Sequence, residues 1–385
     1  IGPVSVSCLI NCHFFEGCLF FYINFRRFIM IKNKFLIALM ATALVFTGSS
    51  SLAAEKVVKW KLAMTWPDGL APFAWTVQRF ADNVEAMSGG RMTIRVDDKN
   101  KHKAALGILD MVEAGQYEMG HSASYYWKGK DINTMPFTTM PFGMTTSEQD
   151  AWYFYGGGEA LAKEVFDKHG VIQHQGGSTG NQMGGWFSKE INSVDDLKGL
   201  KMRIPGFAGE VMAELGVAVT NLPAGELYTA LERGTIDALE WVGPGMDINM
   251  GFHKVAPYYY TGWHEPATDL QFLINQDAWN ELPADLQAIV EVAIVDSKAR
   301  MYWENFAMSA EAWDKMEVDY PNIKVKSFPP EVIAEMKAIN ARLIAETSAR
   351  DPMFKKIMES QAAFMAKARE WTKISDYLYL QDNIE

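Results

Sequence analysis

The sequence predicts an α/β fold of two domains, and three observations support this prediction. The chain has 385 residues, of which 49% are apolar, so it can form more than one core. Strand-like and helical patterns alternate over residues 57–121 and alternate again after residue 206. A single helical pattern then covers residues 283–318 without Gly or Pro after its first turn, so this helix is long enough to span both domains.

The first half of the chain has short connections between its elements, which predicts a parallel sheet with right-handed crossovers. An aromatic-rich stretch follows the third strand, at the kind of strand end where open α/β sheets bind ligands. The predicted elements are a strand at 57–64, helix at 73–87, strand at 91–96, helix at 104–114, strand at 117–121 and helices at 147–155 and 159–168.

Two strands, at 171–175 and 270–274, are predicted to cross between the domains, and an amphipathic helix is predicted from Asp351 to the C-terminus. Between the crossings we expect a helix at 209–215, strand at 217–221, helix at 225–233 and strand at 238–242. The predicted first domain is 55–173 plus 243–269, the second is 174–242 plus 270–328, and the C-terminal helices at 329–385 are available for dimerisation.

The N-terminal region is predicted to lie outside the fold. Residues 1–29 contain no methionine and are interpreted as translated upstream sequence or a misplaced start. Residues 30–54 have the lysines, the short apolar run and the small residues of a secretory signal peptide; a retained membrane anchor is the alternative. The three cysteines all precede Met30, so the exported chain would use no disulfide.

The charge balance argues against some partners and focuses attention on one cation. The net charge of −11 argues against nucleic acid as a partner. An anion must therefore be held by a local cation. Arg203 ends a strand-like run that is closed by Pro205 and Gly206, with Asn181 and Gln182 upstream. This pattern predicts a carboxylate grip by paired hydrogen bonds; the alternative is a surface arginine at a strand end.

A second candidate site contains acidic residues. Glu240 and Trp241 end a predicted strand before a Gly-Pro-Gly turn. With the amide oxygen of Gln182, a backbone carbonyl and Glu265, the Glu240 carboxylate would make an all-oxygen site suited to Na⁺ or Ca²⁺. The alternative is a strand-end glutamate paired with a lysine.

Ser178 belongs to a different class of hypothesis. Residues 176–180 match the G-x-S-x-G pattern of a serine hydrolase, with His253 and His264 downstream. That motif requires a helix after the serine, and the residues after Gly180 are instead glycine-rich and strand-like. The sequence contains no phosphate-binding loop and no GxGxxG pattern between a strand and a helix.

Five runs of sequence, in this order, resemble the substrate-binding proteins of tripartite ATP-independent periplasmic (TRAP) transporters, in the branch that binds 2-oxo acids. The runs are SASYYWKGKD, STGNQMGGWFSKEI, DLKGLKMRIPG, ALERGTIDALEWVGP and KVAPYYYTGWHEP. The resemblance implies a two-domain fold like that of periplasmic binding proteins, with crossing strands, a long bridging helix and a long C-terminal helix.

The resemblance also implies a function and a set of site residues. The protein would be a non-enzymatic periplasmic receptor for a small carboxylate, such as the 2-oxo acid pyruvate, with Na⁺ or Ca²⁺ in the site. It would deliver the ligand to the small and large membrane subunits and could form a homodimer through its C-terminal helix. The implied ligand-binding residues are Arg203, Gln182, Asn181, Trp241, Tyr125 and Tyr126, and the implied cation-binding residues are Gln182, Glu240, Trp241 and Glu265.

Overall fold

The computed structural model describes residues 57–384. The predicted upstream extension (1–29) and signal peptide (30–54) lie outside these residues. Within the described part of the chain, no helix has both the length and the apolar character needed to cross a membrane.

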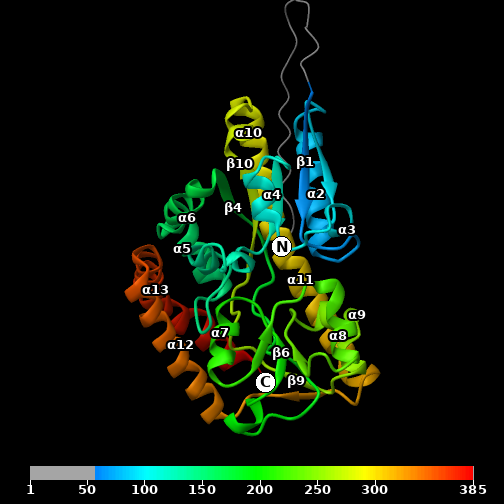
Figure 1. The fold of residues 1–385 in the computed structure, drawn as a ribbon, viewed down its shortest axis with the longest axis vertical. Helices are drawn as coiled ribbons and strands as arrows, with labels where there is room; N and C mark the ends of the chain where they lie inside the picture. The colour runs from blue at the N-terminus through cyan, green and yellow to red at the C-terminus, as the bar shows by residue number, and fades with distance from the viewer. Residues whose placement is uncertain (1–56, 385) are drawn as a thin grey trace, which may run out of the picture. The chain divides into compact units, whose positions relative to one another are not determined.

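The first sheet has five strands in the order β2-β1-β3-β10-β4 (Figure 1). The predicted parallel pairing is confirmed for β1 with β2 and for β1 with β3. β10 lies between β3 and β4 and is antiparallel to both. The strands are β1 (Val58–Met64), β2 (Met92–Asp97), β3 (Met119–Ser122), β4 (Val171–Ser178) and β10 (Asp269–Asn275).

The second sheet has six short strands in the order β11-β9-β5-β8-β6-β7. β6 and β8 are parallel, and their register places Arg203 opposite Leu239. The strands are β5 (Gly185–Phe187), β6 (Lys201–Arg203), β7 (Ala218–Thr220), β8 (Ala238–Leu239), β9 (Tyr258–Tyr260) and β11 (Lys324–Lys326).

The chain crosses between the sheets after β4 and again before β10, as the two predicted crossing strands require. The prediction grouped residues 243–269 with the first domain, but β9, which lies within that range, belongs to the second sheet. β9 pairs with β5 in the second sheet, and only from Asp269 onward does the chain rejoin the first sheet. The pairing partner of a three-residue strand is set by distant residues and leaves no local signal.

The helices surround both sheets, and several match their predicted bounds closely because Gly or a capping residue ends each pattern. The helices before the second crossing are α2 (Phe73–Met87), α3 (Lys99–His102), α4 (Ile108–Glu113), α5 (Thr146–Tyr155), α6 (Gly158–Phe166), α7 (Gly206–Glu214), α8 (Leu227–Glu232) and α9 (Pro244–Met250). Short 3₁₀ turns are η1 (Ser124–Trp127), η2 (Ile132–Phe137), η3 (Asp167–His169), η4 (Val194–Leu197), η5 (Ala224–Glu226) and η6 (Phe252–Lys254).

The predicted bridging helix is α11 (Ala284–Asp319), which follows α10 (Gln276–Asn280). It packs against α2 and β4 of the first sheet and against α9 of the second (Figure 1). Lys298, in the middle of α11, is buried and contacts Asp269 (Nζ–Oδ1 2.5 Å) and Asp150 (2.7 Å). This buried ion pair therefore links α11 to Asp269, the first residue of β10, where the chain re-enters the first sheet.

Helices at 329–385 were predicted and are present, but the single helix predicted from Asp351 is divided into two helices by a π turn. The Asp351 side chain caps α13 by accepting hydrogen bonds from the Met353 and Phe354 amides. The segments are α12 (Pro330–Arg350), α13 (Pro352–Thr372), a π turn η7 (Lys373–Tyr377) and α14 (Leu378–Asn383). α12 packs on α7 and α13 packs on α5 and α6, so the C-terminal helices contact both halves of the molecule.

Gly185 shows why one position of the second sheet requires glycine. Its φ is +111°, and a Cβ placed there would lie 2.4 Å from the carbonyl oxygen of Leu239. The close approach allows β5 to pair directly beside β8, the strand that leads to Glu240.

Candidate ligand and cation site

Arg203 is positioned by the second sheet. It is the last residue of β6, and Pro205 and Gly206 then end the strand and begin α7. β6 pairs with β8, and the Glu240 amide donates to the Arg203 carbonyl (3.0 Å). The backbones of Arg203 and Glu240 are therefore fixed side by side at the strand ends.

The Arg203 side chain is only 1% exposed, and hydrogen bonds hold its guanidinium group in one orientation. Its Nη1 donates to the Glu240 carbonyl (2.6 Å) and to Glu240 Oε2 (3.0 Å), and its Nε donates to the Leu222 carbonyl (3.2 Å). The Trp241 ring lies 5.4 Å from the guanidinium carbon, as in a cation–π contact. A fully buried, preorganised guanidinium at a strand end is suited to binding a small anion.

Three buried side chains form a cluster beside Arg203. One ligand atom from each of Glu240, His264 and Glu265 lies within 4.8 Å of the other two. The His264 Nε2 is 3.5 Å from Glu240 Oε1 and 4.0 Å from Glu265 Oε1. Thr268 donates to the other Glu265 oxygen (2.6 Å), which fixes that carboxyl group.

Several buried polar atoms around this cluster have no hydrogen-bond partner. They are Gln182 Oε1, Glu240 Oε1, Trp241 Nε1 and both ring nitrogens of His264. An unsatisfied buried polar atom costs about 1–3 kcal/mol, so native proteins rarely gather several in one place. Such a group indicates that the site is built for a ligand that supplies the missing partners.

Burial controls the protonation of the cluster. It raises the pKa of Glu240 to about 8, against the opposing charge of Arg203. Burial and then the charge of Glu240 raise the pKa of Glu265 to about 8. Burial lowers the pKa of His264 to about 4, so the imidazole is neutral at physiological pH. A bound cation would replace protons on the two carboxyl groups.

Tyr125 and Tyr126 approach from the first sheet, on the η1 turn that follows β3. Tyr125 is buried, and its ring meets that of Tyr126 edge-on at 4.8 Å. A Cβ placed on Gly206 would lie 3.3 Å from the Tyr125 ring, so this ring packs beside the end of the segment that carries Arg203. Burial, followed by the charge of Glu265, raises the Tyr125 pKa well above its usual value, so the phenol stays a neutral donor.

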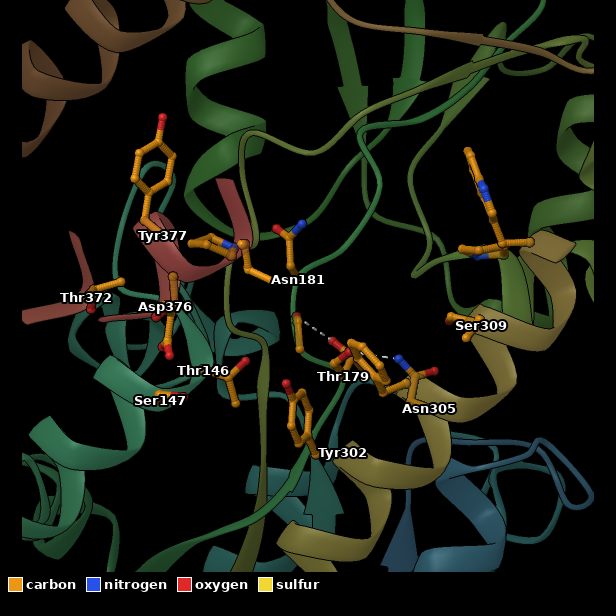
Figure 2. A pocket seen from close by; sticks show the side chains of 18 residues that line it. Thr146, Ser147, Thr179, Asn181, Tyr302, Asn305, Ser309, Thr372, Asp376 and Tyr377 are labelled. Carbon is orange, nitrogen blue, oxygen red and sulfur yellow. Dashed lines mark hydrogen bonds between the residues drawn. The ribbon is translucent and has the colours of Figure 1, made fainter. Parts of the chain in front are cut away.

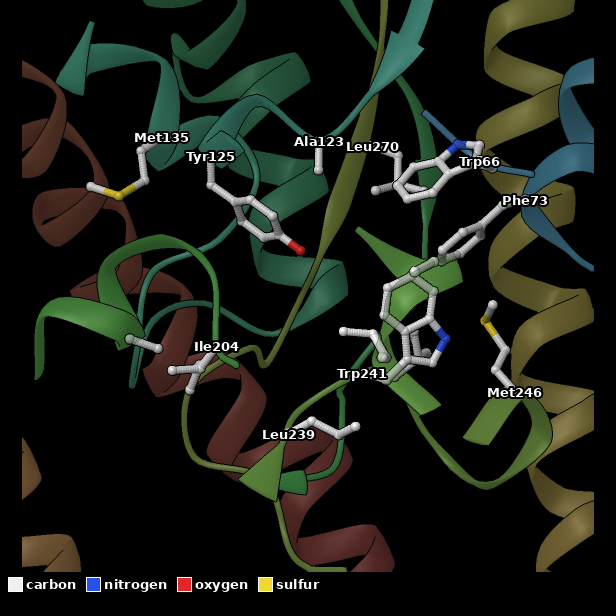
Figure 3. Close-up of a cluster of buried hydrophobic side chains, with 14 of the residues drawn as sticks. Trp66, Phe73, Ala123, Tyr125, Met135, Ile204, Leu239, Trp241, Met246 and Leu270 are labelled. Atoms are coloured by element: carbon white, nitrogen blue, oxygen red, sulfur yellow. The ribbon is translucent and has the colours of Figure 1, made fainter. Parts of the chain in front are cut away.

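Three aromatic rings form a wall near Arg203. The centroids of Trp66 and Phe73 are 4.5 Å apart, and those of Phe73 and Trp241 are 6.2 Å apart. Figure 3 shows these three rings close together at the right of the view and the Tyr125 ring at the left. Trp66 follows β1 and Phe73 begins α2, so the wall joins both halves of the protein.

Most of the predicted site residues come together, but Asn181 does not join them. The backbone N–H of Gln182 donates to the backbone carbonyl of Glu265 (3.0 Å), which places Gln182 beside the cluster. Asn181 is exposed and lines a separate groove of about 770 Å³ beside Tyr302 and Tyr377 (Figure 2). The chain bends at Asn181, directly after Gly180 with its φ of +72°, so Asn181 is exposed whereas the next residue, Gln182, is buried.

The sequence reasoning also missed residues of this region. His264 was considered only in connection with the serine hydrolase hypothesis, and Trp66 and Phe73 were not considered as site residues. The available signal was position, because Trp66 follows a strand end and His264 precedes Glu265.

Among residues 57–384, Ser178 does not have the surroundings that a serine hydrolase nucleophile requires. Ser178 is fully buried at the end of β4, and its Oγ accepts from the Gly180 amide (3.2 Å). The next element is β5, not a helix. His264 instead lies against Glu240 and Glu265, and His253 lies against Tyr320 with ring centroids 4.3 Å apart.

The donor set fits a hard cation. Carboxylate and amide oxygens from Glu240, Glu265 and Gln182 are the ligand types that Na⁺ and Ca²⁺ prefer. The unpartnered Gln182 and Glu240 oxygens are available for such an ion. With Arg203 alongside, the site can hold a cation and a carboxylate together, which defines a receptor for a small organic anion.

Comparison with known proteins agrees with this class. Residues 62–351 match the bacterial extracellular solute-binding proteins of family 7, DctP. A monocarboxylate 2-oxoacid-binding periplasmic protein of Nostoc sp. is 39% identical over 354 residues, covering 91% of this chain and 96% of the relative. The chain therefore belongs to the DctP family of extracellular solute-binding proteins and is a receptor of the TRAP transporter type.

Two solved structures of TRAP periplasmic solute-binding proteins are similar throughout. The protein of Colwellia psychrerythraea, with bound calcium and pyruvate, is 56% identical, with a TM-score of 0.84, covering 85% of this chain and 100% of that chain. The protein of Pseudoalteromonas atlantica, with bound sodium and pyruvate, is 55% identical, with a TM-score of 0.84, covering 86% and 100%. These likenesses confirm the predicted fold class.

Proposed function

We propose that this receptor binds a small 2-oxo acid, with pyruvate as the reference ligand, together with Na⁺ or Ca²⁺. The observation that carries the proposal is the buried Arg203 beside a cluster of unpartnered oxygens. In this proposal the free end of the Arg203 guanidinium binds the ligand carboxylate. Glu240, Glu265 and Gln182 bind the cation, and the neutral Tyr125 and Tyr126 hydroxyls and the Trp241 ring line the ligand site.

The cation accounts for how an acidic protein binds an anion. Two buried carboxyl groups would repel a carboxylate if they were ionised without a counter-ion. A bound cation removes their protons, neutralises their charge and offers open coordination positions to ligand oxygens. Ligand affinity should therefore depend on the cation.

Isothermal titration with pyruvate tests this function, using protein that starts at residue 55. The saturable heat should weaken when Na⁺ is withheld and a chelator removes Ca²⁺. Arg203→Ala should abolish measurable binding, whereas Arg342→Ala, which alters a half-exposed arginine, should leave it unchanged. Tight pyruvate binding by Arg203→Ala would show that the carboxylate role is wrongly assigned.

A further part of the proposal concerns location and delivery. The family is extracellular and the Nostoc relative is periplasmic. TRAP solute-binding proteins work with membrane subunits. We infer that residues 30–54 direct this chain to the periplasm, where the liganded receptor meets the small and large membrane subunits. Deletion of residues 30–54 should leave the protein in the cytoplasmic fraction.

We also propose that two copies associate through the C-terminal region. Large apolar side chains are exposed on α11, at the end of α13 and along η7 and α14, and four of them, Phe306, Trp313, Tyr377 and Leu380, line the groove of Figure 2. A patch of this kind marks an interface, and a self-complementary one favours a symmetric dimer. The exposed residues are Trp303, Phe306, Trp313, Trp371, Ile374, Tyr377, Leu378, Tyr379 and Leu380.

The burial of residues in α13 indicates where the chain can be truncated to test for a dimer. Removal of everything from Asp351 would also remove Phe354 and Ile357, which are fully buried. Removal of residues after Thr372 takes away η7 and α14 and leaves α13 intact. Light scattering should give a dimer for the full chain and a monomer for the truncated chain. A monomeric full chain at micromolar concentration would contradict the proposal.

A further inference from the structure

Asp247 is a fully buried carboxylate that lies outside the proposed ligand set. It sits in the first turn of α9, and its two oxygens accept four hydrogen bonds. Oδ1 accepts from the backbone amides of Val242 (3.1 Å) and Gly243 (3.0 Å). Oδ2 accepts from the Trp186 indole (3.0 Å) and the Tyr259 hydroxyl (2.9 Å).

These partners join the second sheet to the turn that follows the candidate site. Trp186 is on β5 and Tyr259 is on β9, and their rings stack with centroids 3.9 Å apart. Glu240 and Trp241 come after β8, a strand of only two residues, so the strand alone gives them little anchorage. The chain then turns at residues 242–243, where Asp247 holds two consecutive amides.

We propose that Asp247 is a positioning residue for the ligand and cation site. By tying the turn at residues 242–243 to β5 and β9, it sets the direction of the Glu240 carboxylate and the Trp241 ring. Asp247 acts through these residues and does not bind the ligand. The inference rests on the proposed function for its effect on affinity, but its effect on the turn is independent of any ligand.

The chemistry at this position requires a carboxylate. Three of the four donors, the two backbone amides and the Trp186 indole, cannot act as acceptors. An asparagine would present an NH₂ group to at least one of them, whereas the Tyr259 hydroxyl alone could rotate to accept. Asp247→Asn therefore loses bonds at nearly constant volume, and Tyr259→Phe removes one donor while leaving the carboxylate in place.

The matched control is Glu148, a buried carboxylate on α5 with a comparable set of donors. It accepts from the Thr145 amide (2.9 Å), the Thr372 hydroxyl (2.7 Å) and the Arg369 Nε (2.8 Å). These partners belong to the α5 and α13 ends, which carry none of the proposed ligand residues. Glu148→Gln should lower the melting temperature while leaving ligand affinity unchanged.

The test combines titration with Ca²⁺ and pyruvate and hydrogen exchange of the unliganded protein. We expect Asp247→Asn to weaken binding about 10- to 100-fold, Tyr259→Phe to weaken it less, and Glu148→Gln to leave it at the wild-type value. In Asp247→Asn, amides of residues 241–243 should exchange faster than in wild type. Wild-type affinity in folded Asp247→Asn would overturn the proposal.

Two other outcomes are also decisive. If Asp247→Asn does not fold, Tyr259→Phe decides, and unchanged affinity and unchanged exchange at residues 241–243 in that variant would overturn the proposal. If wild-type protein binds neither Ca²⁺ nor pyruvate, the proposed function fails. Faster exchange at residues 241–243 in Asp247→Asn would then still support the positioning role, and unchanged exchange would refute it.

Discussion

Binding of the cation should release protons, because the site holds them when no cation is bound. Burial raises the pKa of Glu240 and of Glu265 to about 8. At pH 7 a carboxyl group with such a pKa is roughly 90% protonated. A cation binds only the deprotonated oxygens, so its binding should release about one proton for each carboxyl group that still holds one.

The pH dependence of Ca²⁺ affinity follows from the linkage between cation binding and proton release. Between about pH 6 and pH 8, Ca²⁺ affinity should rise by about tenfold per pH unit for each proton released, and it should level off above about pH 9. The stability of the ligand-free protein should change in the opposite direction and fall as the pH rises. Glu265 stays protonated in the folded state above its ordinary pKa of 4.5, so the free energy of unfolding falls as the pH rises from there towards 8.

Titration of Ca²⁺ at pH 7 in two buffers with different ionisation enthalpies measures the protons directly. The difference between the observed heats gives the number released, which should lie between one and two for wild type. Glu265→Gln should lower that number by about one. Equal heats in both buffers would refute the reasoning, because both carboxyl groups would then be ionised before the cation arrives.

Three further substitutions have expected results. Lys298→Met should lower the free energy of unfolding by about 3–5 kcal/mol in urea titrations, since it leaves Asp269 buried without its cation; a loss below 1 kcal/mol would contradict this. Gly185→Ala should destabilise the fold by at least about 1–3 kcal/mol, because of its positive φ and the contact with Leu239, as a lower melting temperature would show. Arg203→Lys should weaken pyruvate binding by about 10- to 100-fold in calorimetry because an ammonium cannot replace the fork, and wild-type affinity would argue against paired hydrogen bonds.

The parts of the fold that the sequence predicted are those with strong local patterns. The helix at 73–87 was placed with its observed bounds because its apolar spacing stops at a Ser-Gly-Gly run. The 36-residue α11 was predicted from an unbroken helical pattern. The sheet containing residues 258–260 was not, because pairing depends on residues far along the chain.

The same distinction holds for the candidate site. Arg203 and Glu240 were predicted because each ends a strand, and strand ends of parallel pairs meet at one edge. His264 was missed because a single histidine has no motif spacing, and only the fold brings its ring to Glu240. Asn181 was predicted beside Gln182 in the ligand site; the structure has it exposed at a bend that follows Gly180, and a bend of this kind leaves no periodic pattern in the sequence.

The position of β10 has a consequence for how the chain reaches its folded state. In the first sheet, β4 is an edge strand whose one neighbour is β10, and about ninety residues separate the two strands. Until Asp269–Asn275 has been synthesised, β4 has no partner in that sheet and β3 lacks one of its two. Contacts this distant in sequence form slowly. A fragment that ends before β10 contains the crossing after β4 but not the return to the first sheet. Such a fragment should therefore leave β4 unpaired and the first sheet incomplete, whereas β5, β6, β7, β8 and β9 of the second sheet are all present.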